Sequence, residues 1–460
     1  MEIIRARGFL GEMYSLRPQT GYIMNLYRII NPLANPNTLN RYPVLYGHGV
    51  LFDSHSMISH SEHARPRRPV LGRPTINFGD VDGYNDQSLP FMLSNNNFDV
   101  WLFDARATND YNRNLSAEYD MRNSQTFWDF SLDDQALIDL PILMDFVLTK
   151  TAAPRLVYVG YSESTFFMFA LMTKRPDYAA KVAAFVAMAP VTYVSHIRGL
   201  TVPLVVALQE LMPAGANTNF LPQYLYDMFD TTLRNTCKIK GLNAIFCGLL
   251  YNSIGGPGSG EITPEFFSNF YKSTSLKSLR HFIQLYESKR FGMYDYGLEN
   301  NMRIYKQPLP PAYDLRQIRS DRIILVRGQS DILSTPEDQS RLIRELGTKP
   351  FLDLNIPRYN HFDFVDGKNL IQNVNAPVMV AIYELLYRDG PYILRSPDQM
   401  ALIIANVRLG QGGTEHIERL QATKTNSRSN LFDLQGLVQS VTGGVGLLNQ
   451  VRLLAPNTVG

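Results

Sequence analysis

The sequence predicts an α/β protein in which helices cover a mainly parallel β-sheet. Short apolar segments with strand character alternate along the chain with segments of helical spacing. This alternation is typical of parallel sheets, because a parallel strand reaches its neighbour through a crossover that is usually a helix. The strand-like segments are residues 42–47, 98–104, 155–160, 183–190, 321–328 and 351–357.

Two of the intervening segments carry clear helix signals. Residues 130–148 have apolar side chains at helical spacing. Residues 335–347 begin with Thr335 as a predicted N-cap and Pro336 in the first turn, and they end at Gly347. We therefore expect a helix before the strand 155–160 and another after the strand 321–328.

The alternation is interrupted in three places, which suggests a domain organisation. Residues 54–90 are rich in Gly, Pro, Ser and Asp, so we predict a long loop there. The mainly helical, aromatic-rich residues 191–320 are too numerous for a simple crossover. We predict an α/β core in two parts (1–190 and 321–390), an inserted cap (191–320) and an extra C-terminal extension (391–460).

Composition argues against several classes of function. The 460-residue chain has a formal net charge of +2, which is too balanced to predict nucleic-acid binding. The sequence contains no run of about 18 uncharged apolar residues, so we predict no transmembrane segment. Arg5, Arg7 and Glu12 stand where an export signal would need apolar residues. Cys237 and Cys247 could close a short loop in an oxidising compartment.

The stretch PRLVYVGYSESTFFMFALM, residues 154–172, places a serine between a predicted strand and a predicted helix. On such a tight turn the Oγ of Ser162 would be exposed, next to the N–H groups that begin the helix. This nucleophile elbow usually reads Gly-x-Ser-x-Gly, and here Ser164 replaces the second glycine. The alternative interpretation is a serine that only caps the helix.

An acid and a histidine follow this serine in the order used by α/β-hydrolases. Asp331 comes just after the strand 321–328, and His361 lies in PRYNHFDF, after the last predicted strand. In a triad, His361 would take the proton of Ser162, while Asp331 would fix the ring tautomer and stabilise the imidazolium. Alternatively, Asp331 caps the next helix and His361 is an ordinary loop histidine.

Two backbone N–H groups are candidates for the oxyanion hole. One belongs to Glu163, which directly follows the predicted nucleophile. The other belongs to Val50, in the loop Gly-His-Gly-Val-Leu after the strand 42–47, where glycines allow a close backbone approach.

A cluster of histidines near this loop raises the question of a metal site. The spacing of His60 and His63 suits metal ligands, and His48 and His55 are close in sequence. No cysteine and few carboxylates accompany them, so we expect a solvated loop there, with no metal and no cofactor.

Several longer strings resemble one known family. They are GEMYSLRPQTGYIMNLYRI, HGVLFDS, FDVWLFDARATNDYNRN, FWDFSLDDQALIDLPILMDFVL, YDYGLENNMRIYKQPLPPAYDLRQI, VRGQSDILSTPEDQ and YNHFDF. Over roughly residues 9 to 390 the chain resembles the acid lipases, that is, gastric and lysosomal lipases and their insect relatives. This resemblance implies an α/β-hydrolase fold with a cap or lid. It also implies that the protein acts on lipid esters at a lipid–water interface. It also implies a catalytic triad of Ser162, Asp331 and His361 with oxyanion donors Val50 and Glu163.

The chain departs from this family at several positions. Glu163 stands where the family usually has glutamine, Ser164 replaces the elbow glycine, the loop 59–86 is longer, and the extension is additional. Three functions therefore stay open: a triacylglycerol or steryl ester lipase, a carboxylesterase of smaller esters, and a catalytically silent lipase-like protein. The resemblance implies a secreted or endolysosomal location, whereas the N-terminal sequence favours the cytoplasm.

Overall fold

The computed structural model describes most of the core and part of the predicted cap. The described residues are 1–16, 21–34, 42–61, 64–67, 88–108, 126–210, 231–232, 235–237, 239, 243–259, 272–388 and 451–453. Most of the predicted loop 54–90 and of the C-terminal extension, and also His63, lie outside them.

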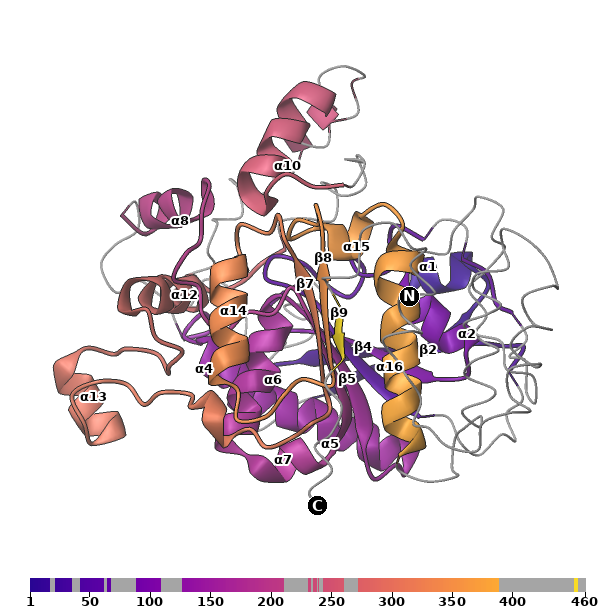
Figure 1. The fold of residues 1–460 in the computed structure, drawn as a ribbon, viewed down its shortest axis with the longest axis horizontal. Coiled ribbons are helices and arrows are strands. Elements are labelled where there is room, and N and C mark those ends of the chain that lie inside the picture. Colours follow the sequence, from indigo (N-terminus) through magenta and orange to yellow (C-terminus); the bar gives the residue numbers. More distant parts are fainter. Residues whose placement is uncertain are drawn as a thin grey trace, which may run out of the picture.

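A nine-stranded sheet forms the centre of the molecule (Figure 1). In space the strands follow the order β1-β2-β4-β3-β5-β6-β7-β8-β9. Every pair from β4 through β3, β5, β6 and β7 to β8 is parallel, and antiparallel pairs occur at the two edges. The strands are β1 (Leu10–Leu16), β2 (Met24–Ile30), β3 (Pro43–Gly47), β4 (Asp99–Asp104), β5 (Leu156–Tyr161), β6 (Val182–Met188), β7 (Ile323–Gly328), β8 (Leu352–Ile356) and β9 (Val451–Leu453).

Helices cover both faces of this sheet, which confirms the predicted α/β-hydrolase architecture. The helical elements that precede β6 in the chain are α1 (Glu2–Ala6), α2 (Leu89–Asn95), α4 (Leu132–Asp134), η1 (Gln135–Asp139), α5 (Leu140–Thr151), α6 (Glu163–Lys174) and α7 (Pro176–Ala180). Those after β6 are α8 (Thr201–Glu210), η2 (Asn243–Cys247), α10 (Gly248–Gly255), α12 (Leu276–Ser288), α13 (Leu298–Tyr305), η3 (Leu315–Gln317), α14 (Pro336–Glu345), α15 (Asp363–Asp366), η4 (Ile371–Asn375) and α16 (Ala376–Tyr387).

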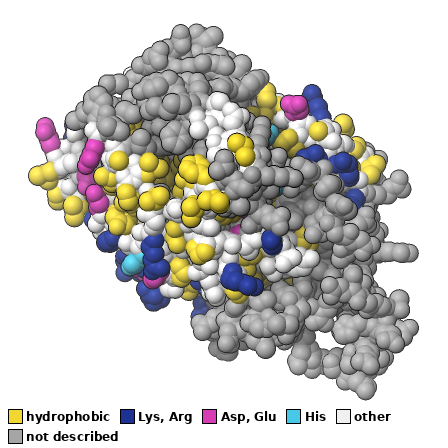
Figure 2. All heavy atoms as spheres, turned by 90° about the horizontal axis from the view of Figure 1, so that it is seen from above, with side chains coloured by type: hydrophobic (Ala, Val, Ile, Leu, Met, Phe, Trp, Pro, Cys, Tyr) yellow, Lys and Arg dark blue, Asp and Glu magenta, His cyan; other side chains and the backbone are white. Residues whose placement is uncertain are grey.

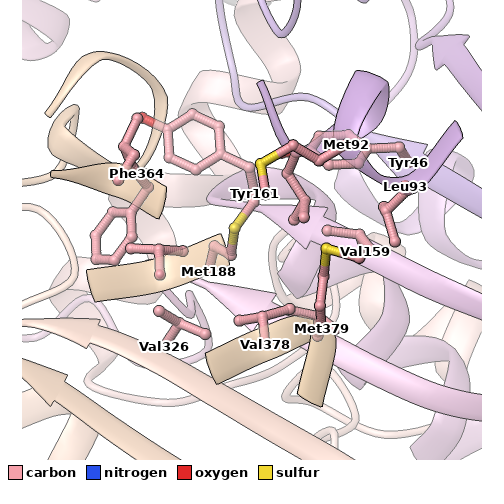
Figure 3. Packing of buried hydrophobic residues seen from close by; sticks show 14 of the residues in the cluster. Tyr46, Met92, Leu93, Val159, Tyr161, Met188, Val326, Phe364, Val378 and Met379 are labelled. Atoms are coloured by element: carbon pink, nitrogen blue, oxygen red, sulfur yellow. The ribbon is translucent and has the colours of Figure 1, made fainter. Parts of the chain in front are cut away.

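The core consists of two apolar layers, one on each face of the sheet. Strand β5 is buried along its whole length, and its side chains alternate between the layers. Val157, Val159 and Tyr161 pack with α2 and α16, as Figure 3 shows for part of this layer. Leu156 and Tyr158 pack with α5 and α6 on the other face. The strand therefore leads into Ser162 from a fully packed interior.

The chain between β6 and β7 is the part predicted as a cap. Its described helical elements are α8, η2, α10, α12, α13 and η3, and α10 lies beyond the upper ends of β7 and β8 in Figure 1. Cys237 and Cys247 are joined in a disulfide, and Cys247 directly precedes α10. The exact limits of the cap stay a prediction. Among the described helices, none combines the length and apolar character needed to cross a membrane.

Candidate active site

Ser162 lies on a strained turn between β5 and α6. Its backbone has a φ of 53° and a ψ of −116°, a conformation that residues other than glycine rarely adopt. Neighbouring groups hold the turn: the Ser162 N–H donates to the Met188 carbonyl at 2.9 Å, and the Thr165 hydroxyl donates to the Ser162 carbonyl at 2.6 Å. The serine is therefore held at the carboxyl end of a central strand, where α/β folds form their sites.

Two glycines make room for this turn. A Cβ atom on Gly160 would lie 3.0 Å from the backbone of Ser164, and one on Gly49 would lie 3.1 Å from the Cβ of Ser162. The first contact is between strand and helix, and the second is between the loop after β3 and the elbow. Glycine leaves room at both positions, because helix backbone lies close to Gly160 and the side chains of Tyr161 and Ser162 lie close to Gly49.

The fold brings Ser162, Asp331 and His361 together. The Nε2 atom of His361 lies 2.8 Å from the Oγ atom of Ser162. Its Nδ1 atom lies 2.9 Å and 3.1 Å from the two carboxylate oxygens of Asp331. All three side chains are buried, so bulk water screens these contacts little.

The carboxylate of Asp331 is held by the backbone that follows it. Its Oδ1 accepts hydrogen bonds from the N–H groups of Leu333 at 2.9 Å and Ser334 at 2.8 Å. The nearer oxygen for the ring of His361 is Oδ2. Because the carboxylate can only accept hydrogen bonds, Nδ1 of His361 carries the proton, and Nε2 is left to accept from the serine hydroxyl.

The two candidate oxyanion donors are the N–H groups of Glu163, directly after Ser162, and of Val50. Glu163 is the first residue of α6, and the first N–H groups of a helix have no acceptor within it. Val50 lines the same cavity as Ser162 and His361. Their roles as donors stay predictions.

Ser164 ties the loop that carries Val50 to the elbow. Its hydroxyl donates to the His48 carbonyl at 2.5 Å. The His48 ring is itself fixed, since Nδ1 contacts the Gly49 carbonyl at 2.8 Å and Nε2 accepts from the Ala105 N–H at 3.0 Å. The serine that replaces the elbow glycine thus makes a specific contact, and both ring nitrogens of His48 are engaged within the protein.

An apolar cavity opens beside the serine. Besides Ser162 and His361, its lining is largely aliphatic and aromatic, with side chains from α8, such as Val202 and Val205, and from α12, such as Leu279 and Phe282. Above it, Figure 2 shows apolar side chains gathered on the outer face of the described cap residues. The polar side chains of Ser162 and His361 therefore face a cavity whose other walls are mainly apolar.

Three curated relatives cover most of this chain. Human lipase member K is 27% identical over 84% of this chain and 90% of its own length. Human gastric triacylglycerol lipase is 28% identical over 83% and 90%, and lipase 1 of Drosophila melanogaster is 27% identical over 79% and 75%. Over most of its length the chain is therefore similar to gastric-type lipases. No family model matches it. Among solved structures, a soluble variant of monoglyceride lipase from Saccharomyces cerevisiae aligns with 84% of this chain and 96% of its own, at 11% identity and a TM-score of 0.48.

Glu163 is a buried acid directly after Ser162, the predicted nucleophile. Desolvation raises the pKa of its carboxyl group from 4.5 to about 8. One of its oxygens, Oε1, is buried without a hydrogen-bond partner among the described residues. At neutral pH the side chain is therefore mainly uncharged, as a glutamine would be, and it places no full negative charge next to the predicted oxyanion site.

We expect Glu163→Gln to remove a pH dependence of stability. Between pH 4.5 and about 8 the folded protein keeps the Glu163 proton and the unfolded chain releases it. The free energy of unfolding therefore falls as pH rises, by up to about 1.4 kcal/mol per pH unit. Chemical denaturation should give equal stabilities for variant and wild type at about pH 4, and a variant more stable by at least about 1 kcal/mol at about pH 8.

The matched control for this measurement is Glu299→Gln, because Glu299 is exposed on α13. Its effect on stability should stay small throughout the range. Above pH 8, turnover by the wild type should also fall more steeply than turnover by Glu163→Gln, because an ionised Glu163 would repel the oxyanion. A stability difference for Glu163→Gln that does not change with pH would contradict this prediction.

Two contacts of the site are not visible in the sequence motifs. The Tyr161 hydroxyl donates to the His361 carbonyl at 2.9 Å. The Gly255 carbonyl accepts from the His361 N–H at 3.1 Å. Tyr161 immediately precedes Ser162, so its position in the motif could have suggested a role in the site. Nothing in the sequence around Gly255 marks that residue.

Proposed function

We propose that this protein hydrolyses lipid esters through an acyl-enzyme formed on Ser162. The observation that carries the proposal is the hydrogen-bonded series from Ser162 to His361 to Asp331 at the edge of an apolar cavity. The names of the homologues, which are lipases, support the same class of reaction.

In the first half of the reaction, the Oγ atom of Ser162 attacks the ester carbonyl carbon. Nε2 of His361 takes the hydroxyl proton, and the ionised Asp331 stabilises the imidazolium that forms. The N–H groups of Glu163 and Val50 would stabilise the oxyanion of the tetrahedral intermediate. The alcohol then leaves with the proton from Nε2, and the acyl group stays on Ser162.

In the second half, water takes the place of the alcohol. Nε2 of His361 accepts a proton from that water as its oxygen attacks the acyl carbon. Collapse of the second tetrahedral intermediate releases the fatty acid, and the proton returns to the Oγ of Ser162. The protein thus ends in the state in which it began, and no cofactor takes part in these steps.

The apolar lining favours a long acyl chain over a small polar one. The cavity walls from α8 and α12 offer Val202, Val205, Leu279 and Phe282 to the substrate. Each methylene buried there contributes about 0.8 kcal/mol. We therefore favour triacylglycerols or steryl esters, presented at a lipid–water interface, over small soluble esters.

We infer that the protein works in an oxidising compartment, outside the cell or in the endolysosomal system. The disulfide between Cys237 and Cys247 is the supporting observation, because disulfides persist mainly in such compartments. The homologues include gastric lipases.

The decisive experiment combines covalent labelling with a substrate series. The protein is incubated with a long-chain alkylphosphonate ester, and the adduct is located by peptide mass spectrometry. Hydrolysis is then measured for esters of increasing acyl chain length, each in solution and as an emulsion. We expect the adduct on Ser162 and the fastest turnover on emulsified long-chain esters.

Each other outcome selects an alternative. Labelling of Ser162 with turnover confined to short soluble esters would identify a carboxylesterase. Neither labelling nor turnover would identify a catalytically silent lipase-like protein and would contradict the proposal.

A further inference from the structure

The last turn of α10 lies between the two loops that carry the acid and the histidine. The carbonyl of Gly255 accepts the N–H of His361 at 3.1 Å and the N–H of Ile332 at 3.4 Å. Ile332 directly follows Asp331. One carbonyl group at the end of a helix in the predicted cap is therefore bonded to both loops of the triad.

No larger residue fits in this position without moving the loops. Gly256 has a φ of 98°, and a Cβ atom on it would lie 2.1 Å from the carbonyl oxygen of Ser330. A Cβ atom on Gly255 would lie 2.5 Å from the ring of Phe362. Ser330 precedes Asp331 and Phe362 follows His361. The pair of glycines thus spans the gap between the two loops in direct contact with each.

The loop of His361 makes further contacts with this part of the chain. The Asn360 side chain donates from Nδ2 to the Gly256 carbonyl at 2.7 Å. The Tyr251 hydroxyl donates to Asp366 at 2.9 Å, and its ring centre lies 5.0 Å from that of Phe362. These residues are buried except for part of Asp366. The histidine loop therefore rests on α10 along most of its length.

Resting on the proposed function, we propose that Gly255 and Gly256 are positioning residues for the triad. They set the spacing between the Asp331 loop and the His361 loop, so the triad is aligned only when the end of α10 is seated between them. Neither glycine touches the reacting atoms. Their effect on catalysis comes from geometry, since a misplacement of about 1 Å at a reacting group can cost about 100-fold in rate.

The test is Gly256→Ala, with Gly297→Ala as the matched control. Both glycines have a positive φ, 98° for Gly256 and 81° for Gly297, so both variants carry a similar backbone cost. A Cβ atom on Gly297 meets nothing within 4 Å. We expect Gly256→Ala to lower kcat on a soluble ester about 100-fold while KM changes less than about threefold, and Gly297→Ala to leave both unchanged.

A second measurement does not depend on activity. The Nδ1 proton that His361 shares with Asp331 should give a downfield proton resonance in wild type and in Gly297→Ala, assigned by its loss in His361→Ala. In Gly256→Ala the resonance should shift or disappear. If the wild type neither forms the phosphonate adduct at Ser162 nor hydrolyses esters, the proposed function fails. The resonance then remains as the test of whether the two glycines position His361 against Asp331.

A milder variant covers the case in which Gly256→Ala does not fold. Tyr251→Phe keeps the ring on Phe362 and removes only the hydrogen bond to Asp366. We expect a several-fold loss in kcat with KM preserved. If Gly256→Ala folds and its kcat and resonance match those of Gly297→Ala, the inference is overturned. If Gly256→Ala does not fold, a Tyr251→Phe variant with the kcat of the wild type overturns it.

Discussion

Ser162→Ala should lower kcat for ester hydrolysis by about six orders of magnitude, as loss of a triad nucleophile does in a serine protease. Removal of the hydroxyl leaves His361 without a group to deprotonate and leaves no atom to accept the acyl group. The turn itself should persist, because it depends on the backbone bonds of Ser162 to Met188 and Thr165. Phosphonate labelling should be abolished while Tm changes little.

The control for this variant is Ser340→Ala. The Ser340 hydroxyl donates to a carbonyl within its own helix, that of Pro336, at 2.7 Å. Turnover by this control should equal that of the wild type. Turnover by Ser162→Ala within about tenfold of wild type would refute the assignment of the nucleophile, because a triad without its serine retains only a small residual rate.

Asp331→Asn should lower kcat by about four orders of magnitude. The two backbone N–H groups of Leu333 and Ser334 already point at one oxygen of this side chain. The amide of asparagine would therefore direct its oxygen to them and its NH2 group to Nδ1 of His361. A donor facing Nδ1 removes the proton from that nitrogen and places it on Nε2, so the ring can no longer accept the proton of Ser162.

Asp331→Asn should leave the fold intact, because its backbone bonds are kept. Asp321→Asn is the control, since Asp321 is exposed and lies 3.6 Å from Arg388 at the surface. Tm should be similar for both variants, and only the first should lose turnover. Equal kcat values for the two would show that Asp331 does not set the tautomer of His361.

The parts of the fold that depend on local sequence could be predicted. The apolar segments 42–47 and 155–160 correspond to β3 and β5 to within a residue, because strands buried on both faces need unbroken apolar runs. Local sequence also predicts the strand before Ser162 and the helix after it. It likewise predicts the order in which Asp331 and His361 follow. The antiparallel β1 and β2 at the sheet edge are not among the alternating apolar segments, and only the resemblance of GEMYSLRPQTGYIMNLYRI to the strand pair of the acid lipases implies them.

What could not be predicted depends on contacts between distant residues. The burial of Glu163, which raises its pKa, depends on how α6 packs on the rest of the core. The bond from Ser164 to His48 joins residues 116 positions apart. It also shows that the departure from the elbow glycine has a structural use here, which weakens the argument that Ser164 marks a silent protein.

The position of α10 between the two loops has a consequence for biosynthesis. Ser162 and His361 are 199 positions apart, and α10 and the loop of Asp331 are made between them. At a synthesis rate of about 5 to 20 residues per second, Ser162 emerges roughly 10 to 40 s before His361. During that interval the nascent chain has a serine but no partner to activate it. Under the proposed function, the protein cannot attack the lipids of the compartment in which it is made until the loop of His361 has folded against α10.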